Sequence, residues 1–321
     1  MSEGLKELPV PFYLPLERKM ESRELYEQVF YEDTEKFVDY YYSCKIQDNE
    51  ILASEEEGQI VSMLHLNPYQ MIVNGYELKS NYIVAVATHK DHRHQGYMRM
   101  LLEKALKDMS CQGMPFTFLM PVNESIYAPF DFVWICPYTK LPGRVMQMDM
   151  EAQNRYLAAR YQMFCKRDGR YMEYQMAEKL AEEGEPEPEK MPPYMARITN
   201  VCQMLRLAGS REKRELYLRV KDSVISKNNG YFLWHASEED SRAETGTPGE
   251  AARREKLSIP PERSDTGRVT KDNAPENKSW STPEKQSVSL AGKEIRLATG
   301  KGDALNMTDW GSCSVGKAIS Q

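Results

Sequence analysis

The stretch Tyr82–Asp108, YIVAVATHKDHRHQGYMRMLLEKALKD, carries the strongest structural signal in this 321-residue chain. Tyr82–Thr88 is an apolar, β-branched run of strand length, and His89–Gln95 is a polar, basic turn. From Gly96 onward, apolar residues recur at three- and four-residue spacing, which is typical of an amphipathic helix. The stretch therefore predicts a strand, a turn and a helix in succession.

This unit is a candidate anion site. The first backbone N–H groups of a helix have no intrahelical partner, and the helix dipole adds partial positive charge at that end. Arg93 and His94 bring side-chain charge to the same turn. The alternative is an ordinary connection between a strand and a helix, with a basic turn that is simply solvated. The local features alone do not choose between these two interpretations.

The segments around this unit predict a sheet with helices on it. Two short helical patterns precede residue 45, and a hairpin turn is expected at Asn74-Gly75. Met114–Pro121 predicts a further strand after the helix. The fold class is therefore α/β (α+β), a mixed sheet flanked by helices, within a domain of residues 1–145. Besides Tyr82–Thr88, its expected early strands are residues 51–54, 59–66, 69–73 and 76–80.

The rest of the chain predicts a connector and a second, smaller domain. Residues 146–193 combine helical patterns with an acidic, Pro-rich linker. A new start at Tyr194 leads to strands at 215–221 and 231–235, so residues 194–321 are expected to form an α+β domain. Within it, residues 237–286 carry few large apolar side chains, which predicts a disordered insertion or a very long loop.

Composition argues against several function classes. The net charge of -6 and the pI of about 5.6 give no electrostatic reason to expect nucleic acid. No apolar run approaches the ~20 residues that a membrane span needs, and the first residues lack a signal-peptide core. The six cysteines show no zinc-type spacing, so no metal site is expected. We expect a cytoplasmic protein without nucleic-acid or membrane partners.

The order of elements and two motifs resemble the GNAT acetyltransferase superfamily. Its acetyl-CoA loop has the form (Arg or Gln)-x-x-Gly-x-(Gly or Ala), and Arg93–Met98 stands in that place, departing from the pattern at Met98. VATHKDHRHQGYMRMLLEKAL and FLMPVNESIYAPFDF together look like the Eis-like (enhanced intracellular survival) branch. MARI near residue 195, ELYLRVKD and NNGYFLW resemble the sterol-carrier-type domain that ends those proteins. Residues 146–193 are too few for the family's second GNAT domain, so the chain resembles a shortened version.

The resemblance implies a site for acetyl-CoA as the acetyl donor. Splayed strands in the family leave backbone groups free for the pantetheine arm, and amides at the helix start hold the pyrophosphate, where a glycine allows close approach. The cofactor-binding residues implied in this way are Val86, Ala87, Thr88, Arg93, His94, Gln95, Gly96, Tyr97, Met98, Arg99, Val122 and Asn123.

The resemblance also implies an acid and a base. Tyr127 matches the general acid that protonates the departing CoA thiolate, and a phenol with an ordinary pKa of about 10 is protonated at neutral pH. The alternative for Tyr127 is aromatic packing. Eis-like proteins use their own C-terminal carboxylate as base, which here belongs to Gln321. His65 and His89 are other candidates, since neutral imidazole is a good base near pH 7.

Two functions compete at this point. The first is an acetyl-CoA-dependent N-acetyltransferase, in which the primary amine of a small molecule or of a lysine attacks the acetyl group directly. The second is a degenerate GNAT domain that binds CoA or serves as an interaction scaffold. A lipid- or acyl-carrier role for the C-terminal domain rests on fold analogy alone. A homo-oligomer is compatible with the resemblance.

Overall fold

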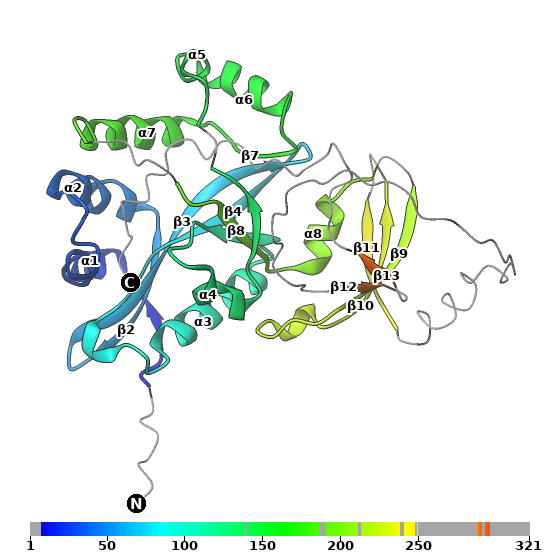
Figure 1. The fold of residues 1–321 in the computed structure, drawn as a ribbon, viewed down its shortest axis with the longest axis horizontal. Helices are drawn as coiled ribbons and strands as arrows, with labels where there is room; N and C mark the ends of the chain where they lie inside the picture. The colour runs from blue at the N-terminus through cyan, green and yellow to red at the C-terminus, as the bar shows by residue number, and fades with distance from the viewer. Residues whose placement is uncertain are drawn as a thin grey trace, which may run out of the picture.

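The computed structural model shows one large twisted sheet with helices packed on it and a smaller sheet beside it (Figure 1). The structure describes residues 8–138, 140–185, 191–210, 213–237, 241–247 and 249, and the backbone of 288–290 and 293–295. The candidate site depends on the large sheet, so its construction is described first.

The large sheet has eight strands in the order β1-β2-β3-β4-β5-β8-β6, and β7 pairs with part of β3. The β4–β5 pair is parallel, whereas the other pairs are antiparallel. The sheet is therefore mixed, as predicted. Its strands are β1 (Phe12–Tyr13), β2 (Glu50–Glu56), β3 (Gln59–Val73), β4 (Tyr76–Thr88), β5 (Phe116–Leu119), β6 (Val133–Cys136), β7 (Met163–Cys165) and β8 (Tyr194–Ile198).

Helices cover both faces of this sheet, because side chains of one strand alternate between two apolar clusters. Met63 of β3 lies in the cluster formed with α1 (Arg23–Val29), α2 (Glu35–Ser43) and α7 (Gly169–Ala181). Its neighbour Leu64 lies in the opposite cluster. That cluster is formed with α3 (Tyr97–Cys111) and α4 (Glu124–Tyr127), which lie together below the sheet in Figure 1. The remaining helices are η1 (Leu16–Ser22), η2 (Lys45–Gln47), η3 (Lys90–His92), η4 (Ala128–Phe130), α5 (Gly143–Met146), α6 (Met150–Ala158), α8 (Val201–Leu207) and η5 (Ser226–Asn228).

The β3–β4 hairpin turns at Asn74-Gly75, as predicted, with φ of 47° and 84° at the two turn residues. The sequence predicted two strands before this turn, but β3 runs unbroken through Pro68. Proline is tolerated because β2 pairs with β3 only as far as Leu66 and β7 begins at Met71, so this part of β3 has no strand on that side. Pro68 therefore loses no ladder hydrogen bond there.

The segment predicted as a helical connector contains α6 and α7, but also the short strand β7 between them. Met163 and Cys165 are buried against the same cluster as Met71, which explains why this apolar triplet joins the sheet edge. The acidic part of the linker, residues 186–190, lies outside the described residues.

Strand β8 shows that the large sheet extends beyond the predicted boundary. Tyr194 was predicted to begin a separate domain, whereas in the structure β8 lies between β5 and β6. Tyr194 and Met195 are fully buried there, and β8 makes four register pairs with β5. Non-local pairing of this kind leaves no local sequence signal, which is why the prediction differed.

The smaller sheet has the order β11-β10-β9, with α8 packed on it. Its strands β9 (Arg214–Val220) and β10 (Gly230–Ala236) confirm the two predicted strands. Strand β11 (Arg242–Gly246) lies inside the predicted disordered insertion and corrects it, since its backbone pairs with β10 and Ala243 is buried. The rest of that insertion lies outside the described residues. Further along, β12 (Val288–Leu290) and β13 (Lys293–Ile295) pair antiparallel.

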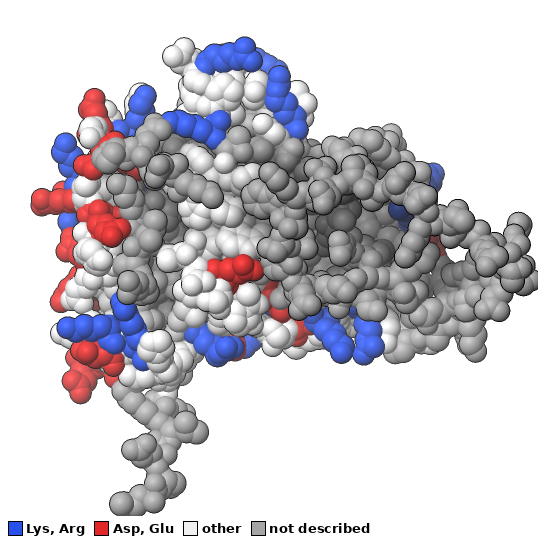
Figure 2. Space-filling view, viewed as in Figure 1, with Lys and Arg blue, Asp and Glu red and all other residues white. Residues whose placement is uncertain are grey.

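Charged side chains are mixed along the edge formed by α1 and α2, where red and blue atoms lie together (Figure 2). Arg23 accounts for part of this pattern, because it lies 2.7 Å from Glu27 and 2.7 Å from Asp39. Exposed pairs of this kind contribute only ~0–1 kcal/mol to stability. Residues 23–43 carry two basic and six acidic side chains, so the edge is a solvated surface with net negative charge.

Candidate active site

Strand β4 is irregular where it approaches the candidate site. Met63 of β3 pairs with Ala87 and His65 pairs with Val84, so β4 contains an extra residue between these pairs. The extra residue forms a β-bulge, and Ala85 beside it has a φ of 50°. The bulge bends and twists β4 locally, and the strand then pairs with β3 again as far as Thr88, just before the loop that follows it.

Strands β4 and β5 separate early. Their register has a single pair, Tyr82 with Phe118, in this fully described part of the chain. Beyond it, β4 continues to Thr88 whereas β5 ends at Leu119. Backbone N–H and C=O groups that face such an opening need another partner. The opening contains Val86, Ala87 and Thr88, the three β4 residues predicted to contact the pantetheine arm.

The loop after β4 presents the start of α3. His94 and Gly96 both have left-handed backbone conformations, with φ of 62° and 98°. Gly96 is the N-cap of α3 and has no side chain with which to cap it. Since a Cβ on Gly96 would lie 3.5 Å from Leu8 Cδ1, an ordinary contact, its φ rather than crowding favours glycine. The first amides of this 15-residue helix are therefore directed out of the loop.

Two exposed side chains hold the loop through backbone carbonyls. Arg93 Nε donates to the Thr88 carbonyl at 3.3 Å, and Gln95 Nε2 donates to the Asp91 carbonyl at 2.9 Å. His94 is exposed beside them. The basic side chains predicted in this loop, Arg93 and His94, are thus exposed. Arg93 and Gln95 also fix the shape of the loop backbone.

Tyr97 points inward and anchors the loop to the β2–β3 hairpin. Its buried hydroxyl donates to the carboxylate of Glu56, and His92 Nε2 lies 3.4 Å from the same carboxylate. Glu56 was not among the predicted site residues, because its only sequence signal is an acidic run before the Gly58 turn. Tyr97 therefore contributes its backbone amide to the helix start while its side chain supports the turn.

The structure brings three predicted residues from distant segments into one apolar cluster. Tyr127 of α4 is a buried member, and Val86 of β4 and Met98 of α3 pack against it. Arg99 adds a further link, because its guanidinium carbon lies 5.0 Å from the centre of the Phe130 ring. The opening of β4, the start of α3 and the end of α4 are thus neighbours.

Tyr127 combines packing with an unused hydroxyl. Its ring is 7% exposed and lies edge-on to Phe132, with ring centres 5.9 Å apart. Its hydroxyl makes no hydrogen bond to any residue that the structure describes. Burial raises the pKa of Tyr127 well above its ordinary value, so the phenol is neutral. Aromatic packing therefore accounts for the ring but not for the hydroxyl.

Val122 and Asn123 follow β5 at the opposite side of the opening. Val122 is exposed, and Asn123 is the N-cap of α4, where its Oδ1 accepts from the Ser125 amide at 2.9 Å. Because this bond fixes the start of α4, it also positions Tyr127 at the end of the same turn.

The candidate bases differ sharply in accessibility. His65 is fully buried, with Nδ1 3.0 Å from the Tyr41 hydroxyl, and burial lowers its pKa to about 3. It is a neutral imidazole that no solvent-borne amine reaches in this structure. His89 is half-buried and lies 3.7 Å from Asp91. Gln321 lies outside the described residues.

Among the described residues, no group of three or more His, Cys, Asp or Glu side chains could hold a metal ion. In the same part of the chain, each helix falls short of the length or the apolar character needed to cross a membrane.

Comparison with known proteins supports the assignment of the fold. Residues 17–135 match a family described as Acetyltransferase (GNAT) domain. A probable N-acyltransferase from Enterococcus faecalis aligns with 74% of this chain and 85% of its own, at 14% identity and a TM-score of 0.58. The large sheet has the GNAT fold.

Other solved structures share this GNAT fold. A GCN5-related N-acetyltransferase from Anabaena variabilis aligns over 75% of this chain and 86% of its own, at 14% identity and a TM-score of 0.54. Eis1 from Mycobacterium abscessus aligns over 74% and 85%, at 10% identity and a TM-score of 0.52. Among curated protein sequences, none matches this chain. At these identities the likeness establishes the fold and leaves the substrate open.

Proposed function

We propose that this protein is an acetyl-CoA-dependent N-acetyltransferase that acts on a primary amine. The observation that carries the proposal is the separation of β4 from β5 after Tyr82–Phe118, directly before the uncapped start of α3. Free backbone groups and a helix N-terminus together suit a ligand that has amide groups in one part and phosphates in another. Acetyl-CoA has this composition, and it supplies the acetyl group.

The residues present fit such a ligand. Val86, Ala87 and Thr88 would bond the pantetheine arm through their backbone, with Val122 and Asn123 across the opening. The amides from His94 to Arg99 would hold the pyrophosphate, and the exposed Arg93 and His94 add positive charge beside it. Support for this assignment comes from the glycine conformation at Gly96 and from the inward turn of Tyr97.

Tyr127 is the proposed general acid. Its hydroxyl hydrogen would bond the sulfur of CoA as the thiolate leaves, and the proton follows as negative charge develops there. Burial keeps the phenol protonated, so the hydrogen is available throughout the working pH range. The same burial disfavours a free phenolate, so the hydrogen bond to sulfur carries much of the stabilisation.

For the acceptor and the base, the proposal names a class of molecule and a set of candidate residues. The acceptor class is a small-molecule amine or a lysine side chain. Of the candidate bases, burial argues against His65, while His89 and the carboxylate of Gln321 stay candidates. The Eis-like affiliation, the sterol-carrier-type C-terminal domain, a homo-oligomer and a cytoplasmic location also stay predictions.

One observation favours the alternative of a CoA-binding domain without turnover. His65, whose strand pairs with β4 at Val84, is covered by three tyrosine side chains at Tyr26, Tyr41 and Tyr42. The sheet face opposite α3 is therefore filled by aromatic side chains. This packing would block an acceptor amine from approaching β4 on that face, as expected for a domain that binds CoA without turnover.

The test is release of free CoA from acetyl-CoA in the presence of a panel of primary amines. We expect turnover with at least one amine, and a loss of about 10²–10⁴-fold in Tyr127→Phe with CoA binding retained. Phe132→Leu is the matched control, because it alters the same aromatic contact and leaves the hydroxyl in place. Unchanged turnover in Tyr127→Phe would remove this residue from the mechanism. Tight CoA binding without turnover on every amine would favour the alternative.

A further inference from the structure

A gap in the sheet edge lies at the other end of β4 from the proposed acetyl-CoA site. Pro68, Tyr69 and Gln70 of β3 lie between the last pair with β2, at Leu66, and the first pair with β7, at Met71. On the β4 side, Gln70 pairs with Lys79. Lys79 and Thr88 are roughly 30 Å apart along an extended strand, so this gap is separate from the candidate active site.

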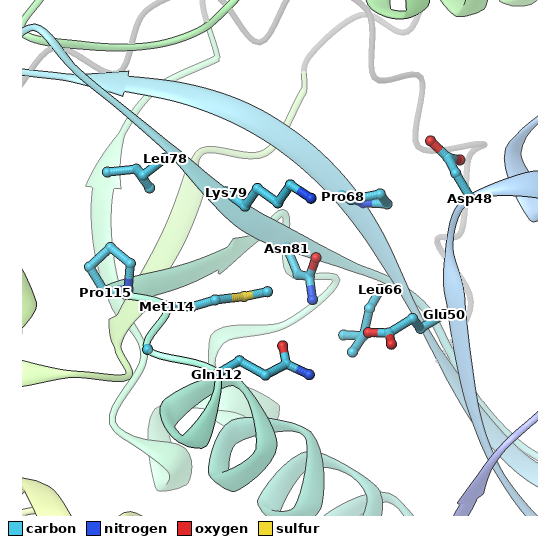
Figure 3. Close-up of a pocket in the computed structure, with 11 residues that line it drawn as sticks. Asp48, Glu50, Leu66, Pro68, Leu78, Lys79, Asn81, Gln112, Met114 and Pro115 are labelled. Atoms are coloured by element: carbon cyan, nitrogen blue, oxygen red, sulfur yellow. The ribbon is translucent and has the colours of Figure 1, made fainter.

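Two cavities flank the gap and share Asp48, Pro68 and Lys79. Figure 3 shows the first, in which the Lys79 side chain extends from β4 toward Pro68. The second has a volume of about 310 Å³ and lies between η2, β3 and α7. A volume of this order suits a small metabolite. The second cavity is lined by Lys45, Asp48, Pro68, Tyr69, Gln70, Lys79, Lys166, Asp168, Arg170, Tyr171, Tyr174, Gln175 and Glu178.

Lys45 is the unusual residue of this second cavity. It is only 8% exposed, and its Nζ lies 4.6 Å from the ring centre of Tyr174 and 5.5 Å from that of Tyr69. Within the described part of the chain, its ammonium has no hydrogen-bond acceptor and no carboxylate partner. Aromatic faces stabilise a buried cation only in part, because an ammonium group loses its hydration on burial. A further anionic partner would complete this site.

Apart from Lys79, the other charged side chains around the cavity, including the buried Glu178, have partners of their own. Asp48 lies 2.8 Å from Arg170 and accepts from the Tyr174 hydroxyl at 3.0 Å. Asp168 caps α7 by accepting from the Tyr171 amide. Lys166 lies 2.7 Å from Glu77.

Lys79 is exposed and, like Lys45, has no carboxylate partner among the described residues. Both lysines line the same cavity. The lining residues comprise four basic side chains and three acidic ones, Asp48, Asp168 and Glu178. Neither Lys45 nor Lys79 pairs with any of these acidic residues, so the cavity favours an anion over a cation.

We propose that this cavity binds a small organic anion, whose carboxylate or phosphate lies against Lys45 and Lys79 and whose apolar part packs on the rings of Tyr69 and Tyr174. Such a ligand bridges η2 and β4 to α7, which follows the strand β7. It would therefore stabilise the packing of α7 on the sheet. The proposal does not depend on the acetyltransferase activity.

The test is calorimetric titration of the full chain with phenyl phosphate and with phenylacetate, which distinguish a phosphate from a carboxylate ligand. Phenol tests whether the ring binds without a charge. We expect saturable binding of at least one of the two anions and none of phenol. Lys45→Met and Lys79→Met should each weaken it by at least about tenfold, the effect of losing one charged hydrogen bond. Lys107→Met, an exposed lysine that does not line the cavity, should bind as the wild type does.

Two further controls are the Gly96→Glu variant and a measurement of folding by circular dichroism. Gly96→Glu should leave binding unchanged, and loss of binding in that variant alone would assign the anion to the loop before α3 and overturn the proposal. Lys79 is exposed, so Lys79→Met tests the site even where Lys45→Met fails to fold, which circular dichroism would detect. Unchanged affinity in Lys79→Met and in a folded Lys45→Met, or no saturable binding of either anion up to millimolar concentration, would also overturn it.

Discussion

The two faces of the large sheet bury polar side chains in different ways. On the face covered by α3 and α4, Arg197 of β8 is 3% exposed and carries the permanent charge of a guanidinium group. It donates to the Phe130 carbonyl at 2.5 Å, to the Ile198 carbonyl at 2.8 Å and to Asp222 at 2.5 Å. On the face covered by α1 and α2, His65 is neutral, and its Nε2 has no partner in the described structure.

Asp222 completes the charged arrangement. Although burial alone would raise its pKa, hydrogen bonds from Arg197, the Ile225 amide and Asn228 lower it. This cluster joins the large sheet to the connection between β9 and β10, and it lies against η4, the turn that follows Tyr127.

The contrast indicates which change should lower the stability of each face. In the charged cluster, the guanidinium of Arg197 and the carboxylate of Asp222 both have hydrogen-bond partners, so its stability should not change with pH near neutrality. This cluster supports the face that carries Tyr127, the proposed acid. The His65 cluster depends on an imidazole staying uncharged, so acid destabilises it. Replacing Arg197 should therefore destabilise the charged cluster, and lowering the pH should destabilise the His65 cluster.

The largest expected effect is that of Arg197→Met. Removing the guanidinium leaves the Asp222 carboxylate buried without its main partner, which should lower the free energy of unfolding by about 3–5 kcal/mol. Denaturant unfolding measures this loss. The control is Arg219→Met, an exposed arginine on β9 whose removal should change stability by no more than about 0.5 kcal/mol. Equal losses in the two variants would mean that the buried cluster is not what holds this junction.

The next effect is pH-dependent. The unfolded His65 takes up a proton below about pH 6.5, whereas the folded one does so only near pH 3, so stability falls as pH decreases between these values. The slope from this group is about 1.4 kcal/mol per pH unit between roughly pH 5.5 and 4.5. Asp222 does not contribute in that window, because its unfolded carboxyl titrates near 3.8.

His65→Asn can still hydrogen-bond the Tyr41 hydroxyl through its side-chain amide, and it cannot take up the proton. Its unfolding free energy, measured between pH 6 and 4.5, should therefore lose that slope, whatever its stability at pH 7. His89→Asn serves as the control for a half-buried histidine outside the cluster. A slope that persists in His65→Asn would show that another group governs acid unfolding.

The smallest expected effect concerns turnover in alkali. Because burial raises the pKa of Tyr127 above its ordinary value, ionisation of this phenol should cause no decline in kcat between pH 8 and about 10. A pH–rate profile with the active acceptor measures this. A decline in the wild type that is absent from the residual activity of Tyr127→Phe would contradict the described burial of the hydroxyl.

The sequence predicted the parts of the site that follow local rules. Gly96 between a basic turn and an amphipathic run marked the start of α3, and Asn74-Gly75 marked the β3–β4 hairpin. Both signals arise from backbone conformations that few residues adopt. The resemblance then added Tyr127, which the structure brings into one cluster with Val86 and Met98.

The remaining features depend on contacts between distant segments. Strand β8 lies between β5 and β6 because Tyr194 and Met195 fill buried positions there, and an isolated five-residue strand gives no indication of its partner. Arg197 lies within that strand, and its buried charge depends on Asp222, which is 25 residues further along the chain. The cavity at Lys45 depends on η2, β3, β4 and α7 together, so no local motif could reveal it.

The most direct test of the central claim compares both ends of α3. Gly96 and Gly113 have left-handed conformations, with φ of 98° and 78°, so Gly96→Glu and Gly113→Glu impose similar strain and the same charge. Calorimetric titration with CoA should show binding abolished in Gly96→Glu, where a carboxylate would meet the pyrophosphate, and retained within about threefold in Gly113→Glu. CoA binding of wild-type affinity in a folded Gly96→Glu variant would contradict the proposed site.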